Sequence, residues 1–227
     1  DSQISTQVDT VNSALVAIAE LNRNIAASSA VGRDPSALID QRQQLIDQVA
    51  TVIPVREIRA ENGHIALYLA GGTALLDGQP AKLTFSPVGV ITPDMTIGSG
   101  ALSGITINGR AINTGANGTI AGGTLAASFA IRDELAPDAQ VELDATARDL
   151  ISRFQDSAIG PTLAPGGAGL FTDGGAAFLA VDEDGIAARL GLNMAVDPNA
   201  GGAVWRIRDG IGALTPGPAG QAALFSS

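Results

Sequence analysis

Two stretches of helical apolar periodicity near the start of the chain limit the folds it can adopt. The second begins at Pro35, where Asp34 is placed to act as N-cap, and should end before Pro54. Because only a short loop around Gly32 separates the stretches, an antiparallel helix pair is predicted. The first stretch, 2–28, has its apolar residues along one stripe, in steps of three and four: Ile4, Val8, Val11, Leu15, Ile18, Leu21 and Ile25. In the second, apolar pairs recur every seven residues: Leu38/Ile39, Leu45/Ile46 and Val52/Ile53.

From Val55 the apolar period changes to two, which is typical of strands. Ile65, Leu67 and Leu69 alternate with Ala66 and Tyr68. They follow an Asn62–Gly63 dipeptide, which predicts a type I′ hairpin turn. Further turns are predicted at Asp77–Gly78, at Asn108–Gly109, and at Pro87 and Pro93. The region 55–120 is therefore predicted to form a small inserted antiparallel β domain.

Helical spacing returns at Gly123 and continues for about thirty residues, interrupted by Pro137. Proline costs about 3 kcal/mol inside a helix. Because the stripe keeps its register across Pro137, a kinked continuous helix is predicted; the alternative is two helices that meet at Glu134–Pro137. The stripe consists of Leu125, Phe129, Arg132, Ala136, Ala139, Leu143, Ala147, Leu150 and Phe154.

After Ser157 the chain is rich in Gly and Pro, which predicts a loop-rich segment with a short strand near Phe178–Val181. The predicted fold class is α+β: an elongated antiparallel bundle of long helices with an inserted small antiparallel β domain and a loop-rich C-terminal segment. The predicted domains are a helical bundle domain of 1–54 plus 121–160, the β domain 55–120, and the segment 161–227, packing back on the helical domain.

Charge and composition argue against several classes of partner. The net charge is −10, with 23 acidic and 13 basic residues, and the basic residues form no cluster, so neither nucleic acid nor an anionic membrane is an expected partner. The absence of Cys excludes disulfides and thiolate metal sites. The start lacks Met and a signal-type apolar block, so a fragment of a longer protein is expected.

The residues that could carry catalysis are few. The single histidine, His64, follows the Asn62–Gly63 turn, where an exposed side chain is expected. The stretch Gly98–Gly104 lacks the G-x-S-x-G spacing and the lysine of a phosphate loop. The acidic turns 182–185 and 197–199 could offer oxygens to calcium but lack the closing Glu of an EF-hand. We therefore predict no catalytic, cofactor or metal site.

Two arginines lie on apolar helical stripes. Arg42 shares a face with Leu38 and Leu45, and Arg132 follows Phe129 at helical spacing. A buried guanidinium needs a carboxylate or carbonyl partner, whereas a snorkelling side chain keeps its head in water. Both alternatives are open, and the candidate partners are Asp133, Asp144 and Asp40.

Several short motifs, in their order along residues 15–172, resemble the flagellar hook-associated protein 1 family. The matches are Leu21-Asn22 with Ile25; Asp40-Gln41-Arg42 with Leu45; Gly71-Gly72 with Leu75, Leu76 and Gly78; Gly122-Gly123 with Leu125; Arg132-Asp133; and Leu143-Asp144. The family's terminal segments have no counterpart here, and an outer β domain after Phe171 is missing or minimal.

The resemblance implies a structural subunit that joins the hook to the filament of a bacterial flagellum, without catalysis or cofactor. It implies export by the flagellar type III apparatus to an extracellular position. The implied partners are the hook protein, the second junction protein, copies of the chain in a ring, and an export chaperone. Alternatives are another flagellar axial protein, such as the second junction protein or a short flagellin, and a secreted carbohydrate-binding or hydrolase module. The structural or interface candidates are Asp40, Gln41, Arg42, Arg132 and Asp133.

Overall fold

The computed structural model describes residues 1–60 and 63–217, which mix helices with small antiparallel sheets, so the predicted α+β class is confirmed. The chain divides into two compact units, Asp1–Ala136 and Pro137–Ser227. The limits predicted from the sequence, 1–54 with 121–160, 55–120 and 161–227, describe a different division and stay a prediction.

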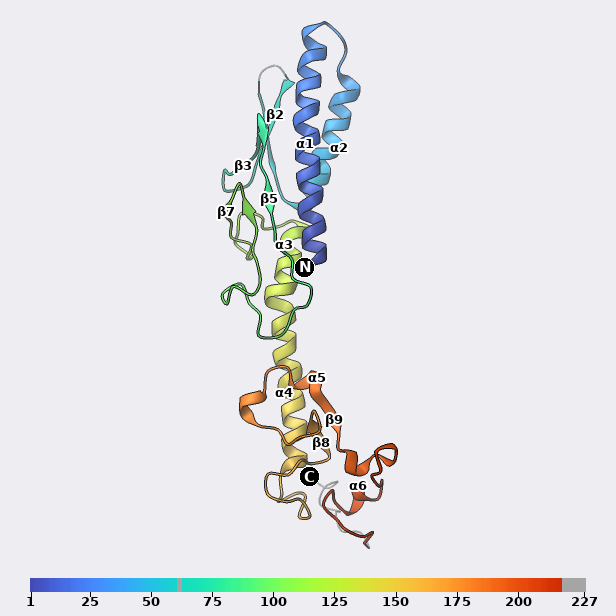
Figure 1. The fold of residues 1–227 in the computed structure, drawn as a ribbon. Helices are drawn as coiled ribbons and strands as arrows, with labels where there is room; N and C mark the ends of the chain where they lie inside the picture. The colour runs from blue at the N-terminus through green and yellow to red at the C-terminus, as the bar shows by residue number, and fades with distance from the viewer. Residues whose placement is uncertain (61–62, 218–227) are drawn as a thin grey trace. The chain divides into compact units, whose positions relative to one another are not determined.

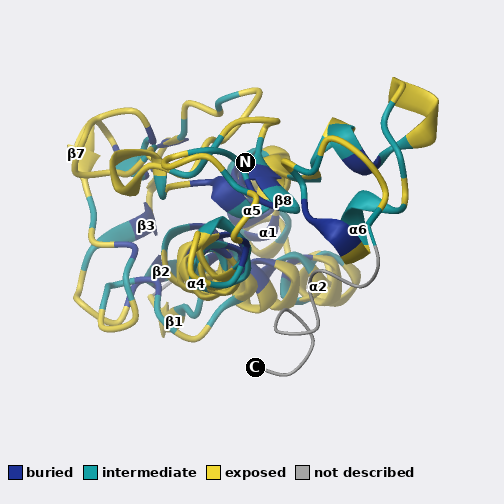
Figure 2. Ribbon diagram, turned by 90° about the horizontal axis from the view of Figure 1, so that it is seen from below, coloured by how far each residue is buried: buried dark blue, intermediate teal, exposed yellow. Residues whose placement is uncertain are grey.

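The first unit is organised around helix α1 (Ser2–Ala30), which lies between helix α2 (Ser36–Val52) and the strands (Figure 1). All seven apolar residues of the predicted α1 stripe are buried, from Ile4 to Ile25. Within helix α2 the members of an apolar pair differ in burial: Ile46 is buried and Leu45 half-buried, and Ile39 is 40% exposed, because adjacent residues are about 100° apart around a helix. Val52 and Ile53 are both buried, since the chain becomes extended at Ile53. Figure 2 shows exposed residues along the outer side of α2.

The start of α2 differs from the prediction by one residue. The N-cap position is Pro35, and the carboxylate of Asp34 instead accepts a hydrogen bond from the Ser36 amide at 3.0 Å. This local bond from residue i to the amide of residue i+2 is one that Asp forms readily ahead of a helix.

Two small antiparallel sheets follow α2 in the first unit. The first sheet has the order β1-β2-β3-β4, from strands Arg56–Arg59, Ile65–Tyr68, Ala74–Asp77 and Gln79–Pro80. The second has the order β5-β6-β7, from Leu83–Thr84, Thr106–Ile107 and Arg110–Ala111.

The geometry of a type I′ turn occurs at Asn108–Gly109. Their φ values are +50° and +78°, and the flanking residues Ile107 and Arg110 pair across the hairpin. Asn and Gly tolerate these left-handed angles, which match the twist of the strands. Of the Asn62–Gly63 dipeptide, to which the sequence assigned this turn type, Asn62 lies outside the described residues.

Two asparagines of α1 fix the start of a strand in each sheet. The Asn22 side chain donates to the Ile65 carbonyl at 2.8 Å and accepts from its amide at 3.2 Å. Asn12 makes the same pair of bonds with Leu83, both at 2.9 Å. Each amide satisfies both backbone groups of one strand residue, so the strands are held in register against the helix.

A glycine is required where the return helix begins. Gly123 is the N-cap residue of helix α3 (Thr124–Ala130), and a Cβ atom there would lie 2.2 Å from the Val52 carbonyl oxygen. No side chain can occupy that distance, so the end of α2 can pass α3 this closely only over glycine.

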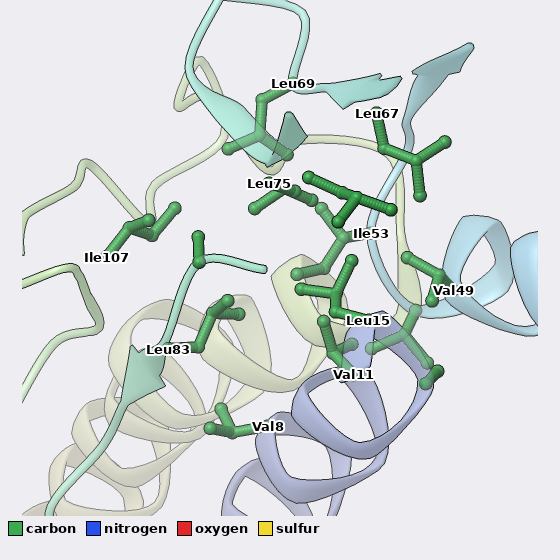
Figure 3. Close-up of a cluster of buried hydrophobic side chains, with 14 of the residues drawn as sticks. Val8, Val11, Leu15, Val49, Ile53, Leu67, Leu69, Leu75, Leu83 and Ile107 are labelled. Atoms are coloured by element: carbon green, nitrogen blue, oxygen red, sulfur yellow. The ribbon is translucent and has the colours of Figure 1, made fainter. Parts of the chain in front are cut away.

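One apolar core joins these elements. Side chains from α1, α2 and both sheets converge in Figure 3, with Val11 and Leu15 facing Ile53, Leu67 and Leu75. Leu15, Ile53, Leu67 and Leu75 each have no exposed surface. The inserted strands therefore share their core with the helices in the first unit.

The return helix is unbroken from Thr124 to Gln155, so the continuous alternative holds. A π-turn, Ile131–Leu135, connects α3 to helix α4 (Ala136–Gln155) directly before Pro137. A π-turn adds one residue to a helical turn and occurs where the regular bonding ladder is interrupted, as proline interrupts it.

The predicted stripe holds only in part after the π-turn. Ala147 is buried as predicted, but Leu143 is 59% exposed and Ala136 and Ala139 are exposed, whereas Asp144 and Ile151 are buried. The additional residue in the π-turn rotates the later side chains by about one position around the axis. The inward face of α4 is also defined by different neighbours, because nearly all of α4 belongs to the second unit.

The second unit has a small core of its own. Ala147 and Ile151 of α4 pack with Ile186, which begins helix α5 (Ile186–Arg189), and with Phe171 and Phe178. Strands β8 (Phe171–Asp173) and β9 (Leu190–Leu192) pair with each other. Short 3₁₀ helices Ala180–Asp182, Met194–Val196 and Pro198–Ala200 and helix α6 (Arg206–Asp209) complete the unit.

The strand predicted near Phe178–Val181 was wrong. Residues Ala180–Asp182 form a 3₁₀ turn, and Val181 is 88% exposed. An apolar run becomes a strand only where a neighbouring strand pairs with it. In this unit β8 and β9 pair with each other, and the run 178–181 is not part of that pair.

The substitution Leu15→Ala tests the core. Leu15 is fully buried, so we expect a loss of about 2–5 kcal/mol in the free energy of unfolding, from lost burial and a remaining cavity. The neighbouring Val16, 56% exposed, is the matched control: Val16→Ala should change stability by less than about 0.5 kcal/mol. Urea unfolding followed by circular dichroism measures both, and equal effects would contradict the α1 stripe.

Candidate functional site

The buried Arg132 is the most extensively bonded charged group of the first unit. Its Nη1 donates to the Asp1 carboxylate at 2.9 Å, and its Nε and Nη2 donate to Asp133 at 2.6 and 3.0 Å. Nη2 also donates to the Ser103 carbonyl at 3.0 Å, and the second Asp1 oxygen accepts from the Val88 amide at 2.9 Å. Arg132 therefore joins the start of α1, the loop 85–105 and the π-turn.

Aromatic rings complete this arginine clamp, which we define as Arg132, Asp1, Asp133 and Ser103. The guanidinium carbon lies 4.8 Å from the Phe129 ring centre and 5.8 Å from that of Phe85. A desolvated cation above an aromatic face is attracted by the ring quadrupole. Two carboxylates offset the cost of burying the charge, so the clamp is well compensated.

Arg42 is buried in a different environment, without a carboxylate. Its Nη1 donates to Asn22 Oδ1 at 2.7 Å and to the Gly63 carbonyl at 2.6 Å. Its Nε is buried and has no hydrogen-bond partner among the described residues. Burial, followed by repulsion from Arg59, lowers the pKa of Arg42 below its ordinary value. The oxygen of Asn22 thus serves two roles, since it also accepts the Ile65 amide.

Both arginines are buried, at 5% and 8% exposure, so the snorkelling alternative is wrong for each. Of the candidate partners, Asp133 contacts Arg132. Asp144 bonds elsewhere, and Asp40 is exposed on the outer face of α2 beside the exposed Gln41. Sequence reasoning missed Asp1 and Asn22, which are 131 and 20 residues from the arginines they contact.

In the second unit a buried carboxylate organises the acidic turn. Asp144 of α4 accepts hydrogen bonds from the amides of Gly185 and Ala187, both at 2.8 Å, and from the Gln140 side chain at 2.8 Å. Burial acts to raise the pKa of Asp144, but these three bonds together outweigh it and hold the pKa below its ordinary value. Asp144 therefore anchors the segment 182–189 to α4.

An arginine fills the centre of the turn that could have offered oxygens to calcium. Arg189 donates to the Asp173 carboxylate at 2.6 and 3.2 Å and to the Asp182 and Asp184 carbonyls. Within residues 1–60 and 63–217, no group of three or more His, Cys, Asp or Glu side chains could hold a metal ion. The positive charge of the guanidinium takes the place that a cation would have.

A cavity of about 600 Å³ opens in the first unit beside the π-turn. Its walls come from the second sheet, the loop 85–105 and the helix 129–134, and Phe129, Ile105 and Ile112 make it largely apolar. Asp133 and Glu134 are its charged lining residues, and no basic residue lines it. The half-buried His64 lies in the first hairpin and is not among the lining residues.

No helix of the described segments is both long and apolar enough to cross a membrane.

The first unit contains a helix pair, two small sheets with one common core, two buried arginines and an acidic cavity that no histidine lines. This is the organisation of a rigid α+β scaffold.

Comparison with known proteins identifies the family. The profile of the flagellar hook-associated protein FlgK helical domain matches residues 1–160, and the chain belongs to this family. The flagellar hook-associated protein 1 of Bacillus subtilis (strain 168) is 34% identical over 76 residues, which are 34% of this chain and 15% of that protein. The resemblance predicted from the sequence motifs is confirmed.

A solved structure supports the fold. The flagellar hook junction protein FlgK from Burkholderia pseudomallei matches with a TM-score of 0.54 and 23% identity, over 75% of this chain and 30% of that one. The chain therefore spans less than a third of the length of each of these two relatives.

The substitution Arg132→Met tests the clamp. It leaves the buried Asp1 carboxylate and the half-buried Asp133 carboxylate without their cation, so we expect a loss of about 3–5 kcal/mol in unfolding free energy. Arg153→Met, at an exposed arginine paired with Asp149 one helical turn away, should cost less than about 0.5 kcal/mol. Urea unfolding gives both values, and a small effect at Arg132 would show that the clamp contributes little to stability.

The substitution Asp144→Asn tests the buried carboxylate through pH. Because the folded pKa lies below the ordinary value of 3.8, the charge stabilises the fold fully above that value, and the contribution disappears as pH falls through the folded pKa. We expect the variant to be less stable by about 1–3 kcal/mol at neutral pH, and the difference to shrink below about pH 4. Thermal melting from pH 7 to pH 2 measures this, with Asp149→Asn at an exposed position of α4 as control. A difference that does not change with pH would contradict the assignment.

Proposed function

We propose that this chain is part of a structural subunit that joins the hook to the filament of a bacterial flagellum and performs no catalysis. The single observation that supports this most strongly is the family match over 1–160, which spans both helices of the pair, both sheets and the return helix. The names of the two relatives, hook-associated protein and hook junction protein, agree with this role.

The physical properties of the first unit suit a protein that transmits mechanical force. Mechanical force on a stacked subunit must pass through contacts that do not rearrange easily. Here two asparagines bind strand backbones to α1, and Arg132 ties three segments that are far apart in sequence. Such buried, satisfied polar groups favour one arrangement of the elements over slipped alternatives.

The proposal includes partners and location. The partners are the hook protein, the second junction protein, further copies of the chain in a ring, and an export chaperone. The site of action is the extracellular hook–filament junction, reached through the flagellar type III apparatus. The exposed Asp40 and Gln41 on the outer face of α2 are candidates for contacts with neighbouring subunits.

Deletion of the gene tests the role. We expect cells that keep hooks, release flagellin into the medium and carry no filaments, because the filament then lacks its base. Electron microscopy and immunoblotting of the medium provide the measurements, and complementation with the intact gene is the control. Normal filaments in the deletion strain would refute the role. Antibody labelling along the whole filament would instead indicate a flagellin.

A further inference from the structure

The acidic cavity and the exposed edge strand β1 have complementary chemistry. The cavity is lined mainly by apolar residues, and its charged lining residues are acidic. Glu134 is exposed, and its carboxylate makes no hydrogen bond within the described part of the chain. Thr84 and Thr106 also line the cavity, and their hydroxyl groups have no hydrogen-bond partner within the described residues. A fitting occupant would carry an apolar side chain, a positive charge and backbone groups that can bond to hydroxyls.

Strand β1 has all three features. It is the edge strand of its sheet, and all four of its residues, Arg56–Arg59, are exposed. Side chains alternate between faces along a strand, so Arg56 and the 49% exposed Ile58 lie on one face. Neither Arg56 nor Arg59 forms an ion pair within residues 1–60 and 63–217, unlike Arg132 or Arg189.

The hydrogen-bond pattern of the hairpin leaves backbone groups of β1 free. The Ala60 amide donates to the His64 carbonyl at 2.9 Å, so the residues bonded to β2 in this antiparallel ladder alternate as Ala60, Ile58 and Arg56. The amide and carbonyl groups of Glu57 and Arg59 therefore point away from β2, toward any chain placed beside the edge.

Pairing of β1 with the same strand of a second copy is disfavoured. An antiparallel pair centred on the strand would place Arg56 opposite Arg59 in both halves, and like charges directly opposite each other are destabilising. No residue of the first sheet lines the cavity, so the strand and the cavity are separate surfaces of one unit. A contact between them must join two molecules in a head-to-tail sense, which generates a closed ring or a helical array.

We propose that β1 of one copy docks at the cavity of the next, with Ile58 against the apolar lining and Arg56 beside Glu134. This proposal rests on the ring of copies proposed above and names the contact that builds it. The chain carries a net charge of −10, so most surfaces of two copies repel, and an exposed basic strand is one of the few surfaces that an acidic cavity can attract.

Cysteine cross-linking tests the contact directly, because the chain contains no cysteine of its own. So that Arg56 and Glu134 are kept, a chain with Ala60→Cys is mixed with a differently tagged chain with Ala111→Cys in the cavity lining, and a short bismaleimide is added. We expect the mixed dimer to form roughly tenfold more than when Ala60→Cys is mixed with Ala50→Cys, at an exposed alanine of α2 outside the cavity. Equal yields in the two mixtures would overturn the proposal.

A second test of the contact exchanges the charges of Arg56 and Glu134 in cells. In the deletion strain, Arg56→Glu alone and Glu134→Arg alone should each lower the number of filaments per cell, and the double exchange should restore it. Melting curves check that the variants fold, since substitutions at exposed positions should change stability by less than about 0.5 kcal/mol.

The two proposals fail in different ways. Loss of filaments on deletion, with equal cross-linking or no rescue by the double exchange, would refute the docking contact and leave the junction role intact. Filaments that persist on deletion would refute the role, whereas the cross-linking result would still decide whether β1 meets the cavity.

Discussion

The apolar stripe of α1 is the constraint on which the first unit depends. Seven side chains from Ile4 to Ile25 are buried along one face, and every other element of the unit covers part of that face or packs against an element that does. Because the stripe runs from Ile4 to Ile25 of the 29-residue α1, one helix partner cannot cover it alone: α2, at seventeen residues, contributes one side and the two sheets the other. The sheets are therefore required by the helix and are not an independent appendage.

Burial of an apolar stripe fixes which face is inside but not how far a strand slides along it. That freedom is removed by polar groups in the same interface. Asn12 and Asn22 each hold one strand residue by both backbone groups, and a shift of one residue would leave buried amides and carbonyls without partners. Arg42 bonds to Asn22 and Gly63, and so joins α2 to the same point. Apolar contacts thus provide most of the driving force, and a few amides and guanidinium groups provide the register.

The parts of this fold that depend on local periodicity could be predicted from the sequence, and those that depend on distant partners could not. The α1 stripe, the extent of α2 and the continuity of the return helix follow from spacing that is visible within one or two turns. The register of α4 depends on a π-turn, whose single additional residue leaves no trace in composition, so Leu143, which was predicted to lie on the inward stripe, is exposed and its neighbour Asp144 is buried. Similarly, two buried arginines were suggested by their place on apolar stripes, but Asp1, which pairs with Arg132 across 131 residues, was not. The cavity combines strand, loop and helix residues and has no signature in sequence order.

The preference for arginine over lysine affects both the interior and the surface of this protein. Twelve of the thirteen basic residues are arginine. The planar fork of the buried Arg132 bonds one carboxylate through two nitrogens and reaches two further oxygens, a geometry that the ammonium group of a lysine does not offer. Arginines consumed in this way, such as Arg42, Arg132 and Arg189, are no longer available to balance the acidic surface. Of the arginines that form no ion pair within the described residues, Arg56 and Arg59 lie on the edge strand β1, with Glu57 and the exposed Ile58 between them. Such a strand combines positive charge with apolar surface in an acidic chain, which is why the contact proposed above uses it.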